Sequence, residues 1–219
     1  VTVSDLLSDD YLKERAGLIK YKQAVDFKAG APKSGGTVYL SAADQDGMMV
    51  SFIQSNYAGF GSGVCIPGTG IHLQNRAAGF SLDPDSPNVV GPKKRPFHTI
   101  IPAFLMDNGS PMMSFGVMGG PMQAQGHIQM VVRNHLWKQN PQEAIDAPRW
   151  RVEGGLDLVC EASMNSQILS FLSECGHNVY TKTSNDAFGF GGAQLIRRLK
   201  NGFYIGGSES RKDGHVVGF

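Results

Sequence analysis

A threonine follows two glycines at the start of a strand-like segment. The sequence reads Gly35-Gly36-Thr37, and Thr37 opens the run TVYLSAA. A threonine hydroxyl can attack a carbonyl when its own α-amino group serves as the base, which requires the preceding peptide bond to be cut. Gly36 suits such a cut, because glycine tolerates unusual backbone angles and leaves its carbonyl accessible. The alternative is that Thr37 is simply a β-branched residue that begins a strand.

Other common reaction centres are not indicated by the sequence. The six histidines show neither an HExxH motif nor paired Cys/His spacing, so we expect no metal. The glycine-rich segments match neither a P-loop nor a dinucleotide fingerprint, and GxSxG is absent, so we expect no cofactor and no α/β-hydrolase elbow. Three cysteines without CxxC spacing favour reduced thiols over a disulfide framework.

Size and charge limit the classes of protein and partner. A chain of 219 residues is long enough for one or two domains with a sizeable core. A net charge of +1 gives no reason to expect nucleic acid or a membrane surface as a partner. The first residues lack a basic region followed by an apolar one, so we expect no signal peptide there. The compartment stays open between cytoplasm and periplasm or secretion.

The order of predicted elements favours an α+β domain. Ser8 is a candidate N-cap for a helix over 8–20, and a polar stretch over 26–36 is the best candidate linker. Strand runs separated by Gly-containing turns predict three hairpins, and helical spacing predicts two further helices. The hairpins span 37–55, 98–118 and 194–207, and the helices span 124–138 and 161–175. We expect layers of helices packed on antiparallel sheets.

A set of motifs, taken in order, resembles one known family. The segments are TVYLSAADQDG from Thr37, VSFIQSNYAGFGSGVCIPGTGIHLQNR, PNVVGPKKRPFHTIIP, GVMGGPMQAQGH and NPQEAIDAPRW. Together they resemble the small subunit of the gamma-glutamyltranspeptidase family. The likeness runs from Thr37 to about Phe219, and residues 1–36 resemble the tail of the large subunit. It implies an N-terminal-nucleophile hydrolase, a four-layer αββα sandwich of which 37–219 is the small-subunit part.

The resemblance implies a catalytic centre and a partner. Thr37 falls at the nucleophile position, with autocleavage between Gly36 and Thr37. Ser55 takes the place of the hydroxyl residue, usually a threonine, that supports the nucleophile. Gly119 and Gly120 match the paired glycines whose N–H groups form the oxyanion hole. The implied partner is the large subunit of the same precursor, and pairing of two such heterodimers is left open.

The segments that recognise the glutamyl group depart from the family pattern. The family motif NN(E/Q)xxDF is replaced by QNRAAGF over 74–80, so Arg76 and Gly79 stand where an acid or amide and an aspartate are usual. His98-Thr99 replaces a Ser-Ser pair, and Tyr57 replaces an Asn. An α-ammonium group would meet the cation of Arg76 instead of a counter-charge.

These departures resemble the divergent gamma-glutamyltransferase-like or cephalosporin-acylase-like branch. Arg76 and His98 suggest a pocket for an acyl group with a distal carboxylate and no α-amino group, such as a dicarboxylic monoamide. Tyr57 and Thr99 complete the predicted substrate-binding residues. A surface-loop position for Arg76 is the alternative.

Two functional hypotheses follow. The first is an autoprocessing amidohydrolase or acyltransferase that cleaves gamma-glutamyl-like or related acyl amides through a threonyl acyl-enzyme. Water is favoured over a peptide as acceptor, since no acceptor site is indicated. The second is an uncleaved, non-catalytic homologue that acts as a structural or binding protein.

Other residues with chemical potential are assigned structural roles. We expect an Asp146–Arg149 contact to fix a turn, and the loop from Glu209 to Gly214 to be structural. His127 and His135, on one predicted helix, are expected to pack instead of taking part in catalysis.

Overall fold

The computed structural model describes residues 8–18, 37–99, 101–183 and 189–219. It divides into two compact units, Val1–Gly35 and Gly36–Phe219. In the first unit, helix α2 (Asp9–Gly17) lies within the predicted 8–20 segment. The hydroxyl of Ser8 accepts a hydrogen bond from the N–H of Tyr11 at 3.4 Å, as expected for an N-cap. The predicted linker over 26–36 lies outside the described residues.

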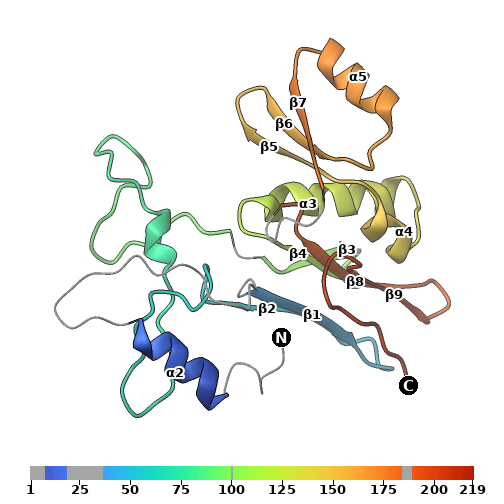
Figure 1. Ribbon diagram of the computed structural model, residues 1–219. Helices are drawn as coiled ribbons and strands as arrows, with labels where there is room; N and C mark the ends of the chain where they lie inside the picture. The colour runs from blue at the N-terminus through green and yellow to red at the C-terminus, as the bar shows by residue number, and fades with distance from the viewer. Residues whose placement is uncertain (1–7, 19–36, 100, 184–188) are drawn as a thin grey trace. The chain divides into compact units, whose positions relative to one another are not determined.

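In the described part of the second unit the strands form three β-sheets (Figure 1). One sheet pairs β1 (Thr37–Ala43) with β2 (Met49–Ser55). The next has the order β3 (Ala103–Asp107), β4 (Ser110–Met118), β8 (Gly192–Arg198), β9 (Tyr204–Ser208). The last has the order β5 (Trp150–Gly154), β6 (Asp157–Glu161), β7 (Asn178–Lys182).

The helices of this unit are short. They are the 3₁₀-helix η1 (Arg76–Gly79), α3 (Met122–Met130), the π-helix η2 (Val131–Leu136), α4 (Pro141–Asp146) and α5 (Ser166–Glu174). None of the helices in the part of the chain that the structure describes is long and apolar enough to span a bilayer.

The three predicted hairpins are confirmed as β1–β2, β3–β4 and β8–β9. In the first turn the carboxylate of Asp44 accepts hydrogen bonds from the N–H groups of Asp46 and Met48, at 3.0 and 2.9 Å. Such side-chain-to-backbone bonds stabilise a turn and so set the strand register. That register places Thr37 opposite Ser55.

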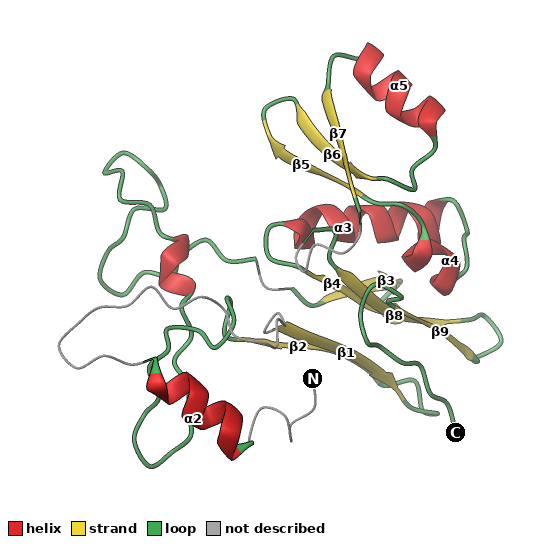
Figure 2. Ribbon diagram, viewed as in Figure 1, coloured by secondary structure: helices red, strands yellow, loops and turns green. Residues whose placement is uncertain are grey.

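The sheets and helices form layers (Figure 2). Helices α3 and α4 cover one face of the four-stranded sheet, and the β1–β2 hairpin packs on the other. Buried apolar side chains fill the space between this sheet and the helices, including Met113, Phe115, Val117, Met130, Ile145 and Leu195. Helix α5 packs against the β5–β6–β7 sheet and forms a smaller core with it.

The contact between the hairpin and the four-stranded sheet includes a cluster of hydroxyl groups around the buried Tyr39. The Tyr39 hydroxyl lies 2.6 Å from Ser51 Oγ and 2.8 Å from Ser41 Oγ. Ser41 Oγ lies 2.9 Å from Ser114 Oγ, which donates to the Val50 carbonyl. Val38, Leu40 and Phe52 point to the opposite, exposed face.

Three of the expectations about elements need correction. The helix predicted over 124–138 is α3 followed by the π-turns of η2. The helix predicted over 161–175 begins only at Ser166, where Asn165 accepts a hydrogen bond from the Gln167 N–H, because Asp157–Glu161 is the buried strand β6. The sheets are not all antiparallel, since β6 and β7 run parallel.

The prediction that Asp146 contacts Arg149 is wrong. Arg149 is fully buried and pairs with Glu209 at 2.6 Å, whereas the Asp146 carboxylate accepts from Gln142. Burial lowers the pKa of Arg149, and the negative charge of Glu209 opposes this shift. A buried guanidinium needs a buried anion, and the exposed Asp146 cannot provide one.

The partners of Arg149 belong to a larger buried cluster of charges. Arg211 bridges Glu161 and Glu209 at 2.6 and 2.7 Å. Burial alone would lower the pKa of Arg211, but hydrogen bonds and charges from the two glutamates outweigh it and raise the pKa. These ion pairs hold the start of the loop predicted to be structural.

His127 has a packing role, as expected. Its Nε2 accepts a hydrogen bond from the Val117 N–H at 3.0 Å, and its ring lies 5.0 Å from that of Phe115. Burial lowers its pKa from 6.5 to about 4, so the imidazole is neutral at pH 7. Helix α3 is thereby hydrogen-bonded to β4.

We predict that Glu209→Gln lowers the free energy of unfolding by about 3 kcal/mol, because Arg149 loses its buried counter-charge. Glu153→Gln is the matched control, since Glu153 pairs with Arg151 at 2.6 Å but is 46% exposed. The control should change stability by less than about 1 kcal/mol. Denaturant unfolding of the full-length protein measures both variants, and equal losses would contradict a special role for the buried pair.

We also predict that His127 makes the protein acid-sensitive. Between pH 6.5 and about 4 the unfolded chain binds a proton that the folded chain does not. Stability is therefore fully present above pH 6.5 and falls by up to about 3 kcal/mol as the pH drops to 4. His127→Gln should flatten this dependence in urea titrations at pH 7, 5 and 4. His72→Gln, at an exposed histidine, should not flatten the pH dependence of stability.

Candidate active site

The first and last residues of the β1–β2 hairpin bring two hydroxyl groups together. Thr37 Oγ1 lies 2.8 Å from Ser55 Oγ, across the pair of strands. Ser55 Oγ also accepts a hydrogen bond from the Tyr57 N–H at 2.9 Å. With one lone pair so engaged, the Ser55 hydroxyl can donate its proton to Thr37 Oγ1. This is the arrangement that the resemblance implied for a nucleophile and its supporting hydroxyl.

Arg76 lies beside this pair of hydroxyls. Its Nη2 donates to the Ser55 carbonyl at 3.4 Å, and its guanidinium lies 5.5 Å from the centre of the Tyr57 ring. Tyr57 has a φ of 80°, which is rare for a bulky residue and occurs mostly where the surroundings impose it. Burial lowers the pKa of Arg76, and the electrostatic effect of Tyr57 partly offsets this shift.

The Arg76–Gly79 turn is tied to the segment that carries Thr99. Asn88 bridges the two, donating from Nδ2 to the Gly79 carbonyl and accepting from the Phe97 N–H at 2.8 Å. A Cβ atom on Gly79 would lie only 3.0 Å from the Phe97 carbonyl oxygen. The absence of a side chain at Gly79 therefore allows the 97–99 segment to approach the turn.

The paired glycines follow the end of β4 and have positive φ angles. Gly119 has φ 132° and Gly120 has φ 59°, both unfavourable for other residues. A Cβ on Gly119 would lie 2.9 Å from Cα of Gly191, and a Cβ on Gly191 would lie 2.5 Å from the Met118 carbonyl oxygen. The two backbones are thus in direct contact.

The buried charge cluster anchors both sides of Gly191. Arg149 Nη1 donates to the Phe190 carbonyl at 2.9 Å, and Glu209 accepts from the Ala193 N–H at 2.7 Å. Because Gly191 lies between these anchors, the cluster fixes the backbone that Gly119 contacts.

One pocket of about 200 Å³ unites most of the predicted site residues. Its lining includes Thr37, Ser55, Tyr57, Arg76, Thr99, Gly119 and Gly120. His98 is exposed and does not line this pocket, and Gly36 lies outside the described residues. The lining also includes Ala58, Pro121 and Gln123, which sequence reasoning missed. The position of Gln123 three residues after the paired glycines, at a helix start, was a signal for it.

The described lining of the pocket carries several polar side chains but no carboxylate. Among the described residues, no group of three His, Cys, Asp or Glu side chains is placed to hold a metal ion. The chemistry that the described lining offers is therefore that of hydroxyls, backbone N–H groups, a carboxamide and one guanidinium.

Two related sequences are proenzymes with the same degree of identity to this chain. A glutathione hydrolase-like proenzyme of Bacillus subtilis is 36% identical over the whole chain, which covers 42% of that relative. An oxamate amidohydrolase proenzyme of Klebsiella pneumoniae is likewise 36% identical, with 100% of this chain and 42% of the relative covered. The chain thus spans less than half the length of these relatives.

Comparison with solved structures supports the same conclusion. The crystal structure of a cephalosporin acylase from Bacillus halodurans is 48% identical, with a TM-score of 0.78 over 99% of this chain and 39% of that one. The similarity confirms the predicted α+β fold of the N-terminal-nucleophile hydrolases. The profile described as Gamma-glutamyltranspeptidase matches residues 1–219. The chain belongs to the gamma-glutamyltranspeptidase family.

Proposed function

We propose that this chain is part of an autoprocessing amidohydrolase or acyltransferase in which Thr37 is the nucleophile. The observation that carries the proposal is the 2.8 Å contact between Thr37 Oγ1 and Ser55 Oγ at the wall of a pocket that also contains Gly119 and Gly120. The names of the relatives as proenzymes support a processed precursor. On this proposal, residues 1–36 end the large subunit and residues 37–219 form the small subunit.

Maturation would use the same hydroxyl as turnover. Thr37 Oγ attacks the Gly36 carbonyl, and the peptide C–N bond breaks to leave an ester and a free α-amino group on Thr37. Water then hydrolyses the ester, which releases the Gly36 carboxylate and restores the hydroxyl. Ser55, by hydrogen bonding to Oγ1, holds the hydroxyl in one orientation for this attack.

Turnover would proceed through a threonyl acyl-enzyme. The freed α-amine accepts the Oγ proton as Oγ attacks the substrate amide carbon. The N–H groups of Gly119 and Gly120 stabilise the oxyanion, and the amine leaves with the proton. Water attacks the ester next and releases the acid. Paired glycines suit this role because no Cβ blocks the approach of the oxyanion.

The acyl group is proposed to carry a carboxylate and no α-ammonium group. Arg76 is the cation of the pocket, and no Asp or Glu occurs in its described lining. An ammonium group there would meet repulsion without a counter-charge, whereas a carboxylate would find one. The name of the oxamate amidohydrolase, whose substrate combines a carboxylate with an amide, agrees with this class.

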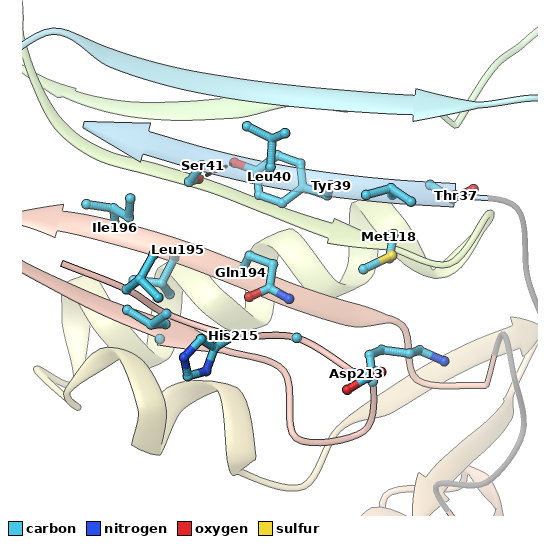
Figure 3. A pocket seen from close by; sticks show the side chains of 16 residues that line it. Thr37, Tyr39, Leu40, Ser41, Met118, Gln194, Leu195, Ile196, Asp213 and His215 are labelled. Atoms are coloured by element: carbon cyan, nitrogen blue, oxygen red, sulfur yellow. Dashed lines mark hydrogen bonds between the residues drawn. The ribbon is translucent and has the colours of Figure 1, made fainter. Parts of the chain in front are cut away.

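The large subunit of the precursor is the proposed partner. The hairpin leaves Val38, Leu40 and Phe52 exposed. A groove of about 380 Å³ runs between β1 and the segment 212–217, beside Gln194 of β8 (Figure 3). Exposed apolar faces and open strand edges usually mark interfaces. The relatives extend well beyond the matched region, which supports such a partner.

We predict that Thr37→Ala abolishes processing. Intact-mass measurement of the full-length parent should give two chains cut before Thr37, and the variant should give one uncut chain. Thr37→Ser should still cleave, since it keeps the hydroxyl. One uncut chain from the parent as well would support the alternative of a non-catalytic structural or binding homologue.

We predict that Arg76→Met selectively impairs carboxylate-bearing substrates. The value of kcat/KM for glutaryl-p-nitroanilide should fall about 10- to 100-fold, since a hydrogen bond to a charged group contributes about 1.5–3 kcal/mol. Hydrolysis of the neutral pentanoyl analogue should not fall. Arg95→Gln, which removes an exposed cation from a loop outside the pocket, is the control. Equal turnover of L-γ-glutamyl-p-nitroanilide and the glutaryl amide by the parent would contradict the assigned role of Arg76.

A further inference from the structure

Gln123 is a buried polar residue on the wall of the acyl pocket. It lies in the first turn of α3, where its N–H donates to the Gly120 carbonyl at 3.0 Å. The residue is only 4% exposed and lines the same pocket as Thr37 and Arg76. A buried carboxamide must satisfy both its oxygen and its nitrogen, or its burial is costly.

The orientation of the Gln123 carboxamide is set by one hydrogen bond. Its Oε1 accepts from the Ile101 N–H at 3.2 Å. With the oxygen engaged by the backbone, the two N–H donors of Nε2 are left for another acceptor. Across the segments that the structure describes, Nε2 has no hydrogen-bond partner in the protein.

Two other groups of the pocket also have hydrogen-bonding capacity that the described residues do not use. Thr99 Oγ1 is buried and, within the described part of the chain, makes no hydrogen bond. Arg76 is half-buried, and within the described segments its guanidinium donates one hydrogen bond, to the Ser55 carbonyl. Donors from three separate segments thus line a pocket whose described lining has no Asp or Glu. Such a set is complementary to an acceptor-rich anion.

We propose that Gln123 is a specificity-determining residue, which donates from Nε2 to the carboxylate of the acyl group that Arg76 also contacts. The inference rests on the proposed function and deepens it. The guanidinium supplies charge, and the fixed carboxamide supplies direction, so that a carboxylate is distinguished from a neutral group of similar shape. A pocket of about 200 Å³ restricts the acyl group to a short dicarboxylic acid monoamide.

The test compares Gln123→Leu with Gln125→Leu in the full-length, processed protein. Gln125 is on the same helix, and its carboxamide exchanges two hydrogen bonds with the backbone of Val152, at 3.1 and 2.7 Å, outside the pocket. The substrates are glutaryl-p-nitroanilide and neutral pentanoyl-p-nitroanilide. Binding of free glutarate to the full-length protein is measured separately by calorimetry.

Gln123→Leu should lower kcat/KM for the glutaryl substrate about 10- to 100-fold, mainly through KM, and leave the pentanoyl substrate within about threefold. Glutarate binding should weaken by a similar factor. Gln123→Glu should lose more, because it keeps the acceptor for Ile101 but places a negative charge beside the carboxylate. Gln125→Leu should match the parent in both assays, and all variants should be processed fully.

Equal losses on both substrates, or unchanged glutarate binding in Gln123→Leu, would overturn the inference. If the parent itself is neither processed nor active, the proposed function fails. Glutarate binding then decides the inference by itself, and equal affinity in the parent and Gln123→Leu overturns it. If the Arg76 variant discriminates between the substrates while the Gln123 variant does not, the proposed function stands and the inference fails.

Discussion

The site depends on a close approach of two backbones, at Gly119 and Gly191. No side chain fits between them, since a Cβ on either would overlap the other segment. The approach is held by the buried ion pair of Arg149 and Glu209, whose hydrogen bonds flank Gly191. A group of charges in the interior therefore stabilises the conformation of an uncharged turn at the pocket. The costs of burying these charges are offset only because each charge has several partners.

The pocket combines two sets of features with different physical origins. The hydroxyl pair and the glycine turn depend on the ends of strands, so strand register and sheet packing place them. Arg76 and Thr99 lie instead on irregular segments joined through Asn88. Loops of this kind can change their side chains without disturbing the sheets. The loop side chains that line the pocket can therefore vary while the strand ends stay in place.

The parts of the structure that could be predicted from the sequence were those fixed by local chemistry. The hairpins were predictable because residues such as Asp44 hydrogen-bond their own turns. The pairing of Arg149 with Glu209 could not be predicted, because the two residues lie sixty positions apart in the sequence and meet only in the folded protein. Strand β6 was not predicted, because the helical spacing of the residues after it favoured a single helix over 161–175. The orientation of the Gln123 carboxamide depends on the distant Ile101 N–H, which no local pattern reveals.

The hydroxyl-lined inner face of the β1–β2 hairpin has a consequence for folding. Val38 and Leu40 point outward, whereas Tyr39 is buried on the inner face, where its hydroxyl lies beside those of Ser41 and Ser51. A slip by one residue would reverse the two faces. The bonds of Ser41 to Ser114 and of Ser51 to the Ala103 carbonyl form only when the hairpin docks in register on the completed sheet. The Asp44 turn already pairs Thr37 with Ser55 within the hairpin, and docking on the sheet selects the same register a second time.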